Sequence, residues 1–252
     1  MKNIYDCFTG KAKMYALSWP QFGKEYFQII LENIKEIDSK VAFDVACGTG
    51  LHTKTICSAF KKVYAIEPNA DMLNQCKSFL YDIRNVEFCL STAENLSNIE
   101  EQADVIFVAQ AFNLLNHDQV KSSFRKKLKK DGLVVLSWNS KIDHSLFREL
   151  SKVSEQYCPT YKNKFYKYKY EANTFNYFFK KKPKFYRFLS DIPFFIDKET
   201  FLSRCLSTSY ALAKWHANFS NYLKALEEIF NKHQNAEKIF YPLETIVYIG
   251  EI

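Results

Sequence analysis

The sequence predicts a doubly wound α/β fold with a largely parallel sheet, and three observations support this prediction. β-rich apolar runs alternate with amphipathic stretches over the first 140 residues, as in parallel sheets covered by helices. The apolar run Val41–Ala46 ends in a loop of small residues, Cys47-Gly48-Thr49-Gly50, and a helical pattern follows from Leu51. The chain has 252 residues and 47% hydrophobic content, enough for one such domain with an insertion.

The expected elements follow in strict alternation through the first half of the chain. We expect strands at 41–46, 63–66, 86–90, 104–109 and 132–138, and helices at 24–37, 51–60, 69–80 and 118–129. Two further runs, 238–243 and 245–249, predict an antiparallel C-terminal hairpin. The expected fold is therefore a seven-stranded, mostly parallel sheet.

The loop after the first strand indicates a site for a nucleoside-like ligand. Small residues let the backbone approach a ligand, and ligands of such sheets lie beyond the carboxyl ends of the strands. Glu67 ends the next apolar run, where nucleotide-binding folds keep an acid for ribose hydroxyls. Neither a phosphate loop nor a complete Gly-x-Gly-x-x-Gly pattern is present, so we expect no pyrophosphate. An ordinary βαβ turn with an incidental acid is the alternative.

Two segments resemble motifs I and II of the class I S-adenosylmethionine-dependent methyltransferases. They are Asp44-Val45-Ala46-Cys47-Gly48-Thr49-Gly50 and Glu67-Pro68-Asn69-Ala70-Asp71-Met72-Leu73. The resemblance implies a Rossmann-like methyltransferase fold with S-adenosylmethionine as cofactor. It implies that the glycine loop surrounds the methionine and ribose and that Glu67 holds both ribose hydroxyls. Ser91-Thr92-Ala93-Glu94 resembles the family element that lines the adenine, with a surface turn as the alternative.

Other segments resemble the small-molecule methyltransferases related to trans-aconitate methyltransferase. Phe8, Tyr15 and Trp19-Pro20-Gln21-Phe22 follow the spacing of that subfamily's opening segment, with Trp19 and Phe22 in place of Arg and Tyr. These aromatic residues either close over the cofactor or tether the N-terminal segment to the core.

The ends of the expected fourth and fifth strands match the same subfamily. Gln110-Ala111-Phe112 agrees with it, but Asn113-Leu114-Leu115 replaces His-Trp-Phe and so removes an aromatic wall and a candidate base. Trp138-Asn139 matches the end of strand five. His117 is interpreted as a surface residue at the start of a helix.

A polar segment near residue 205 also resembles that subfamily. In Phe201–Tyr210, Arg204 could pair bidentately with a substrate carboxylate and Tyr210 could donate a hydrogen bond. Helix capping by the serines is the alternative.

These resemblances imply two sets of residues that contact ligands. The cofactor set is Asp44, Ala46, Cys47, Gly48, Thr49, Gly50, Glu67, Pro68, Met72, Thr92, Ala93, Gln110, Ala111 and Tyr15. The substrate set is Trp19, Phe112, Asn113, Trp138, Arg204 and Tyr210. Cys47 could be a nucleophile, but a small packing residue suits that place equally well. We name no catalytic base and expect no metal, since the seven cysteines are scattered without a C-x-x-C pair.

The segment from 140 to 200 has a different character. Thirteen aromatic residues and eight lysines lie between 157 and 188. We expect 140–200 to be an inserted cap over the substrate, and 1–139 with 201–252 to form the cofactor-binding domain. Alternating lysines and aromatic residues also suit single-stranded nucleic acid, and aromatic packing within the cap is the third interpretation.

The net charge of +7 could indicate an anionic partner, nucleic acid included, although the lysines of 121–130 fit a solvated helix face. No apolar run is long enough for a membrane span, and the N-terminus does not read as a signal peptide. We therefore expect a cytoplasmic protein, monomeric or homodimeric. The leading hypothesis is methyl transfer to a small-molecule carboxylate or hydroxyl. RNA methylation and a non-catalytic binding domain are the alternatives.

Overall fold

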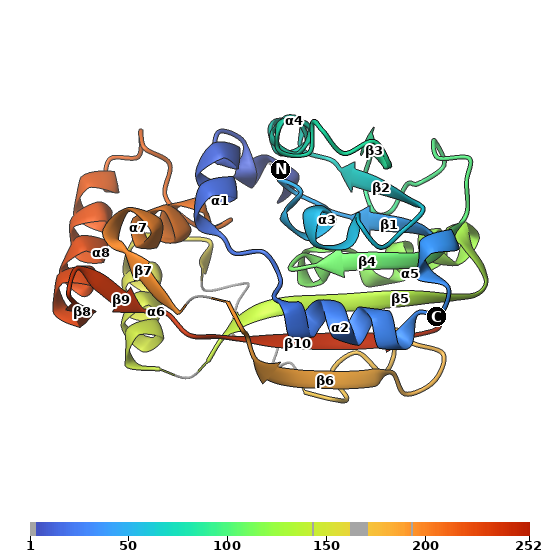
Figure 1. The fold of residues 1–252 in the computed structure, drawn as a ribbon. Helices are drawn as coiled ribbons and strands as arrows, with labels where there is room; N and C mark the ends of the chain where they lie inside the picture. Colours follow the sequence, from blue (N-terminus) through green and yellow to red (C-terminus); the bar gives the residue numbers. More distant parts are fainter. Residues whose placement is uncertain (1–3, 143, 162–170, 193) are drawn as a thin grey trace.

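The computed structural model describes residues 4–142, 144–161, 171–192 and 194–252, and its centre is a seven-stranded sheet (Figure 1). The strand order is β3-β2-β1-β4-β5-β10-β6, and only β10 runs antiparallel to its neighbours. The strands are β1 Val41–Val45, β2 Lys62–Glu67, β3 Val86–Leu90, β4 Ala103–Ala109, β5 Leu128–Lys141, β6 Lys184–Leu189 and β10 Leu243–Gly250. The predicted fold class is confirmed.

Helices lie between these strands, mostly where the apolar periodicity predicts them. Their bounds are η1 Ile4–Phe8, α1 Ala12–Ser18, α2 Lys24–Asn33, η2 Ile37–Ser39, α3 Leu51–Ile56, α4 Ala70–Phe79, η3 Phe112–Leu114, α5 His117–Lys127, α6 Ser145–Tyr157, α7 Lys198–Ser207 and α8 Phe219–His233. α2 and α3 end about one turn earlier than expected. No helix within the described ranges combines the length and apolar character that a bilayer crossing requires.

β1 has a hydrophobic core on each of its faces. Val41, Phe43 and Val45 contribute to the core on the side of α5, whereas Ala42 contributes to the core on the side of α2, α3 and α4. Side chains alternate along a strand, so a strand buried on both faces carries a continuous apolar run. This explains why the run 41–46 is a reliable signal in the sequence.

The expected C-terminal hairpin of 238–243 and 245–249 is wrong. The antiparallel partners of β10 are β5 and β6, whereas β9 (Lys238–Phe240) pairs with β7 (Phe195–Asp197) and β8 (Gln234–Asn235) in a separate three-stranded sheet. Pro242 stands between β9 and β10 and has no N–H group to donate, so it separates the two runs.

A third hydrophobic core lies beyond the carboxyl ends of the parallel strands. Helices α6, α7 and α8 and the three-stranded sheet pack around Leu146, Phe201, Tyr222 and Tyr241. Figure 1 shows these elements grouped on the far side of α1 from the central sheet. We call this group the lobe; its described residues are 144–161 and 194–241.

The lobe does not coincide with the insertion expected at 140–200. β6 lies inside that range but belongs to the central sheet, and Phe175, Phe178 and Phe179 pack in the core on the α5 side of that sheet. α7 and α8 lie outside the range but belong to the lobe. For these described phenylalanines, packing is therefore the correct interpretation. The expected cap aromatics Tyr166, Tyr168 and Tyr170 lie outside the described residues.

Candidate functional site

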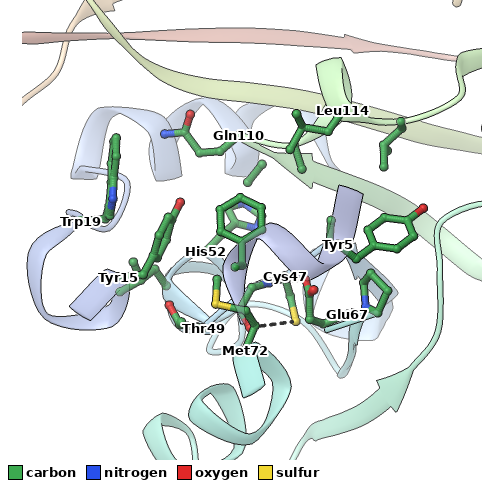
Figure 2. A pocket seen from close by; sticks show the side chains of 18 of the residues that line it. Tyr5, Tyr15, Trp19, Cys47, Thr49, His52, Glu67, Met72, Gln110 and Leu114 are labelled. Atoms are coloured by element: carbon green, nitrogen blue, oxygen red, sulfur yellow. Dashed lines mark hydrogen bonds between the residues drawn. The ribbon is translucent and has the colours of Figure 1, made fainter. Parts of the chain in front are cut away.

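A pocket opens at the carboxyl ends of β1, β2 and β4, and α1 covers one side of it (Figure 2). It has a volume of about 930 Å³ with its open mouth included, which is in the range of small-molecule sites. Its lining residues are Tyr5, Phe8, Tyr15, Trp19, Pro20, Phe22, Ala46, Cys47, Gly48, Thr49, Leu51, His52, Glu67, Pro68, Met72, Ala109, Gln110, Ala111, Leu114 and Leu115.

The loop between β1 and α3 depends on two glycines with positive φ. Gly48 has a φ of 59°, and Gly50 has a φ of 85°. A Cβ atom on Gly50 would lie 2.7 Å from the sulfur of Cys76, so only glycine lets α3 begin this close to α4. Between the two glycines, the hydroxyl of Thr49 is buried in the pocket wall without a hydrogen-bond partner.

Glu67 holds the loop from the end of β2. Its carboxylate accepts hydrogen bonds from the backbone N–H groups of Gly48, at 3.0 Å, and Asn69, at 2.9 Å. The side chain is buried, and this burial raises its pKa from 4.5 to about 7, although the two N–H groups act in the opposite direction. Each carboxylate oxygen accepts one bond here and can accept another, so two neighbouring ligand hydroxyls would fit.

Two other pocket residues have strained backbones. Ala46 (φ 56°) follows β1 and Gln110 (φ 65°) follows β4, although neither is glycine. These adjacent strands are the topological switch point of the sheet, because β2 lies beyond β1 on one side and β5 beyond β4 on the other. Strained residues of this kind concentrate at functional sites, and ligands of doubly wound sheets bind at the switch point.

The N-terminal segment closes the pocket with aromatic rings. Tyr15 stacks on Trp19 with ring centroids 5.5 Å apart, and Phe8 contacts the edge of Tyr15 at 6.3 Å. Burial raises the pKa of Tyr15 to about 12. At the other end of the segment, the Tyr5 hydroxyl donates to Glu94 at 2.9 Å. Of the two interpretations of this segment, closure over the pocket agrees with these positions.

A buried hydrogen-bond network supports the loop from below. Nδ1 of His52 lies 2.9 Å from Asp44, and its Nε2 lies 2.7 Å from the Tyr26 hydroxyl. The Thr53 hydroxyl donates to the same aspartate at 2.6 Å. Asp44 is therefore a residue that positions the loop from beneath, and both ring nitrogens of His52 are engaged.

Cys47 is buried in the loop, and this burial, with Cys76 beside it, raises the pKa of its thiol well above the ordinary value. A nucleophilic cysteine requires the thiolate and hence a lowered pKa. The environment of Cys47 therefore favours the packing interpretation.

Most of the expected cofactor residues line the pocket. Those that do so are Ala46, Cys47, Gly48, Thr49, Glu67, Pro68, Met72, Gln110, Ala111 and Tyr15. Asp44, in β1, and Gly50, at the start of α3, do not line the pocket. Ala93 is buried in the core on the α5 side of the sheet, and neither Ala93 nor Thr92 lines the pocket.

The expected substrate residues are more dispersed. Trp19 lines the pocket. Phe112 and Trp138 are instead buried in the core on the α5 side of the sheet, where they pack against Phe175. Asn113 accepts a hydrogen bond from Trp138 at 3.4 Å. Phe112 and Trp138 face the core because both pack against Phe175, a long-range contact that no local sequence pattern predicts.

The remaining two expected substrate residues, Arg204 and Tyr210, lie beyond the wall of the pocket. Arg204 donates from Nε to the Ser18 carbonyl at 2.6 Å, and Tyr210 contacts the edge of Tyr161 with ring centroids 4.8 Å apart. Neither lines the pocket.

Several pocket residues were not expected to contact a ligand. Leu114 and Leu115 supply an apolar wall in place of the missing aromatic one, and Tyr5 and His52 also line the pocket. His52 had a usable signal, since it is the second residue of the helix that follows the glycine loop. Tyr5 had none, because its place depends on the long-range contact with Glu94. His117 begins α5 as expected and is partly exposed, with its ring stacked on Phe112 at a centroid distance of 4.2 Å.

Comparison with known proteins agrees with this geometry. The family described as a methyltransferase domain matches residues 42–132. Malonyl-[acyl-carrier protein] O-methyltransferase 2 of Coxiella burnetii is 34% identical over 119 residues, which are 45% of this chain and 48% of that protein. A candidate methyltransferase of Dictyostelium discoideum is 28% identical over 131 residues, 52% of this chain and 48% of that protein. The chain thus spans about half the length of these curated relatives.

Solved structures extend the likeness in fold to nearly the whole chain. A candidate type II methyltransferase from Anaeromyxobacter dehalogenans has a TM-score of 0.56 at 14% identity and covers 92% of this chain and 97% of its own. YcgJ of Bacillus subtilis has a TM-score of 0.56 at 13% identity and covers 90% and 99%. Residues 42–132 form a class I methyltransferase domain. The methyl donor of this class is S-adenosylmethionine; the trans-aconitate subfamily stays a prediction.

The pocket of the methyltransferase domain fits S-adenosylmethionine on three observations. Glu67 has acceptor capacity for two adjacent ribose hydroxyls. Thr49 lines the pocket, and its buried hydroxyl has no hydrogen-bond partner among the described residues. At Gly48 a Cβ atom would meet only the end of Met72, at 3.4 Å, so the glycine leaves this side of the loop open.

Proposed function

We propose that the protein transfers the methyl group of S-adenosylmethionine to a small-molecule acceptor. One observation carries this proposal: Glu67 and the glycine loop line the same pocket. Glu67 accepts a hydrogen bond from the Gly48 N–H, and the loop hydroxyl of Thr49 has no hydrogen-bond partner among the described residues. We propose that Glu67 accepts both ribose hydroxyls and that Thr49 bonds the methionine part. Leu114, Leu115 and Pro68 then contact the adenine.

The shape of the pocket supports a position for the acceptor at the end that lies away from Glu67. Figure 2 shows Glu67 and Tyr5 at one end and Trp19 and Gln110 at the other. With the ribose on Glu67, the methyl group would lie toward Trp19 and Gln110. A sulfonium carries the methyl group in an activated form, so the residues there need only hold the acceptor in line and exclude water. The stacked rings of Tyr15 and Trp19 suit that task.

The titratable residues of the pocket favour an acceptor that needs no base. Both nitrogens of His52 are engaged, and burial raises the pKa of Tyr15 to about 12. A carboxylate oxygen attacks without losing a proton, whereas a neutral hydroxyl requires a base. The relative from Coxiella burnetii is named an O-methyltransferase, which also supports an oxygen acceptor. We therefore propose a carboxylic acid as the acceptor.

Calorimetric titration with S-adenosylhomocysteine tests the cofactor site directly. We expect the wild-type protein to bind it and Thr49→Val to weaken binding about tenfold, because the variant removes one hydrogen bond. Thr49→Ser keeps the hydroxyl and should stay within about threefold of the wild type. No binding by folded wild-type protein would refute the proposal.

Transfer itself is tested with methyl-labelled S-adenosylmethionine and a panel of organic acids, with RNA in a parallel reaction. Label in an organic-solvent-extractable, base-labile ester supports the carboxylate proposal. Label in RNA would replace it with RNA methylation, for which the described aromatic residues offer less support because Phe175, Phe178 and Phe179 are buried. Binding of S-adenosylhomocysteine without transfer to any acceptor would favour the non-catalytic alternative.

A further inference from the structure

We infer that Asn139, Lys141 and Arg204 form a subsite for an anionic group of the acceptor that does not itself react. This inference rests on the proposed function, since it assigns a substrate class to the same site. Asn139 and Lys141 lie at the carboxyl end of β5, and Arg204 lies on α7.

Arg204 is a buried cation with unused hydrogen-bonding capacity. Its side chain is 4% exposed, and its Cζ lies 4.9 Å from the centroid of the Tyr241 ring. Nε donates to the Ser18 carbonyl at 2.6 Å, but Nη1 is buried without a partner. Among the described residues no carboxylate pairs with it. A buried guanidinium without a counter-ion is costly, so an anion that reached it would be held strongly.

Lys141 is a second cation near the same tyrosine. It is the last residue of β5, and its Nζ lies 5.4 Å from the centroid of Phe147. The side chain is exposed at the end of β5, so the lysine carries its ordinary positive charge at neutral pH. No ion pair involves Lys141 within the described part of the chain.

Asn139 supplies a third donor on the same face of the strand. It lies two residues before Lys141, and residues two apart in a strand point to one side. Its Oδ1 accepts hydrogen bonds from Thr245 at 2.9 Å and Ser190 at 3.3 Å. Its Nδ2 is buried and has no acceptor. A donor left unpaired inside a protein destabilises the fold unless a ligand satisfies it.

An aromatic pair connects the two cations. Phe147, under Lys141, contacts the edge of Tyr241, under Arg204, with ring centroids 4.8 Å apart. Lys141 and Arg204 thus flank one aromatic pair, and among the described residues no carboxylate forms an ion pair with either cation. Such a set of donors recognises an oxyanion, and Arg and Asn can both donate to its oxygens.

Hydrogen bonds link this subsite to the pocket. Gln110 donates to the Asn139 carbonyl at 3.4 Å, and Trp19 donates to Ser207 at 2.9 Å, one turn of α7 from Arg204. Gln110 and Trp19 are also the residues at the end of the pocket opposite Glu67 (Figure 2). An acceptor that presents one group to the methyl donor can thus reach the subsite with a second, anionic group.

The test uses succinate and inorganic phosphate as probes, titrated calorimetrically into protein saturated with S-adenosylhomocysteine at low ionic strength. We expect at least one probe to bind, and its identity tells whether the subsite takes a carboxylate or a phosphate. Lys141→Met should weaken that binding at least tenfold. Lys77→Met is the matched control, because Lys77 is exposed on α4, and it should bind as the wild type does.

A second variant addresses charge directly. Asn139→Asp keeps the shape and the bonds from Thr245 and Ser190 but puts a negative charge beside Lys141, so probe binding should be lost. The S-adenosylhomocysteine titration of each variant shows whether it folds and keeps the cofactor site. If cofactor binds but neither probe does, or if Lys141→Met binds the probe unchanged, the subsite is refuted and the proposed function stands. If cofactor does not bind, the proposed function itself fails.

Discussion

At the scale of single residues, the carboxyl group of Glu67 connects folding with ligand binding. Its pKa rises from 4.5 to about 7 on folding because it is buried. The folded protein thus holds a proton between these pH values that the unfolded chain releases. The resulting stabilisation is complete below pH 4.5 and is lost as the pH rises through 7.

We predict that Glu67→Gln removes this pH dependence in the ligand-free protein. Between pH 4.5 and 8, the free energy of unfolding of the wild type should fall relative to that of the variant by up to about 3 kcal/mol. Urea unfolding of both proteins at the two pH values measures the difference, in which the other titrating groups cancel. If the free energy of unfolding of both proteins depended on pH in the same way, the raised pKa of the buried Glu67 would be refuted. The variant should also bind S-adenosylhomocysteine more weakly at every pH.

At the scale of elements, the network of Tyr26, His52 and Asp44 joins α2, α3 and β1 beneath the cofactor loop. Tyr26→Phe removes the hydroxyl that pairs with Nε2 of His52 and leaves this nitrogen buried and unpaired. We expect a loss of about 1–3 kcal/mol in the free energy of unfolding, measured by chemical denaturation. Tyr186→Phe is the control, because Tyr186 bonds Asn33 at a half-exposed place on β6 and should cost less. Equal losses in both variants would argue against a special role of the network.

The turn between β8 and β9 gives a prediction of the opposite sign. Asn235 pairs with Lys238, and the two residues between them, Ala236 and Glu237, have φ values of 50° and 60°. A two-residue turn with two positive φ angles prefers Asn-Gly. The double variant Ala236→Asn and Glu237→Gly should therefore raise the free energy of unfolding by about 1 kcal/mol, seen as a higher melting temperature.

The control is a glutamate-to-glycine substitution inside a helix, where glycine is unfavourable. Glu228→Gly lies in the middle of α8 and should destabilise the protein by about 1 kcal/mol. If the turn variant is as destabilised as the helix variant, the positive φ angles are not the backbone conformation of this turn.

At the scale of the whole molecule, α1 connects the cofactor pocket with the lobe. Lys11 donates to the Thr208 carbonyl at 2.7 Å, and Trp19 donates to Ser207 at 2.9 Å. The other side of α1 carries Tyr15, which lines the pocket. A ligand that orders α1 therefore also orders the end of α7.

We predict that S-adenosylhomocysteine slows amide hydrogen exchange in α1 and in α7, and not only in the loop at 46–50. Hydrogen exchange with and without ligand measures this, since local opening sets the exchange rate. α5, on the opposite side of the sheet from the loop, serves as the internal reference. Protection confined to the loop and β2 would show that α1 does not couple the two parts.

The pocket residues that directly follow a strand were predictable, because a local sequence pattern marks where each strand ends. The loop 46–50 and Glu67 are each fixed by their own strand, and the parallel pairing of β1 with β2 brings them to one edge. The strand ends at Gln110 and Ala111 follow from the same rule. Phe112 and Trp138 were expected at the pocket but pack against Phe175 in the core, a contact between distant residues that no local pattern predicts.

By itself, the sequence determined the parallel sheet, its glycine loop and the acid that faces it, because each is a local pattern of burial and backbone conformation. Only the tertiary structure decided which segments make up the lobe. As local runs, β6 and β9 look alike, but β6 pairs with β10 in the central sheet, whereas β9 pairs with β7 and β8 in the lobe. The tertiary structure also set the environment of Arg204, which donates to the Ser18 carbonyl and lies over the Tyr241 ring. These contacts join residues far apart in the chain, where the sequence carries no signal of proximity.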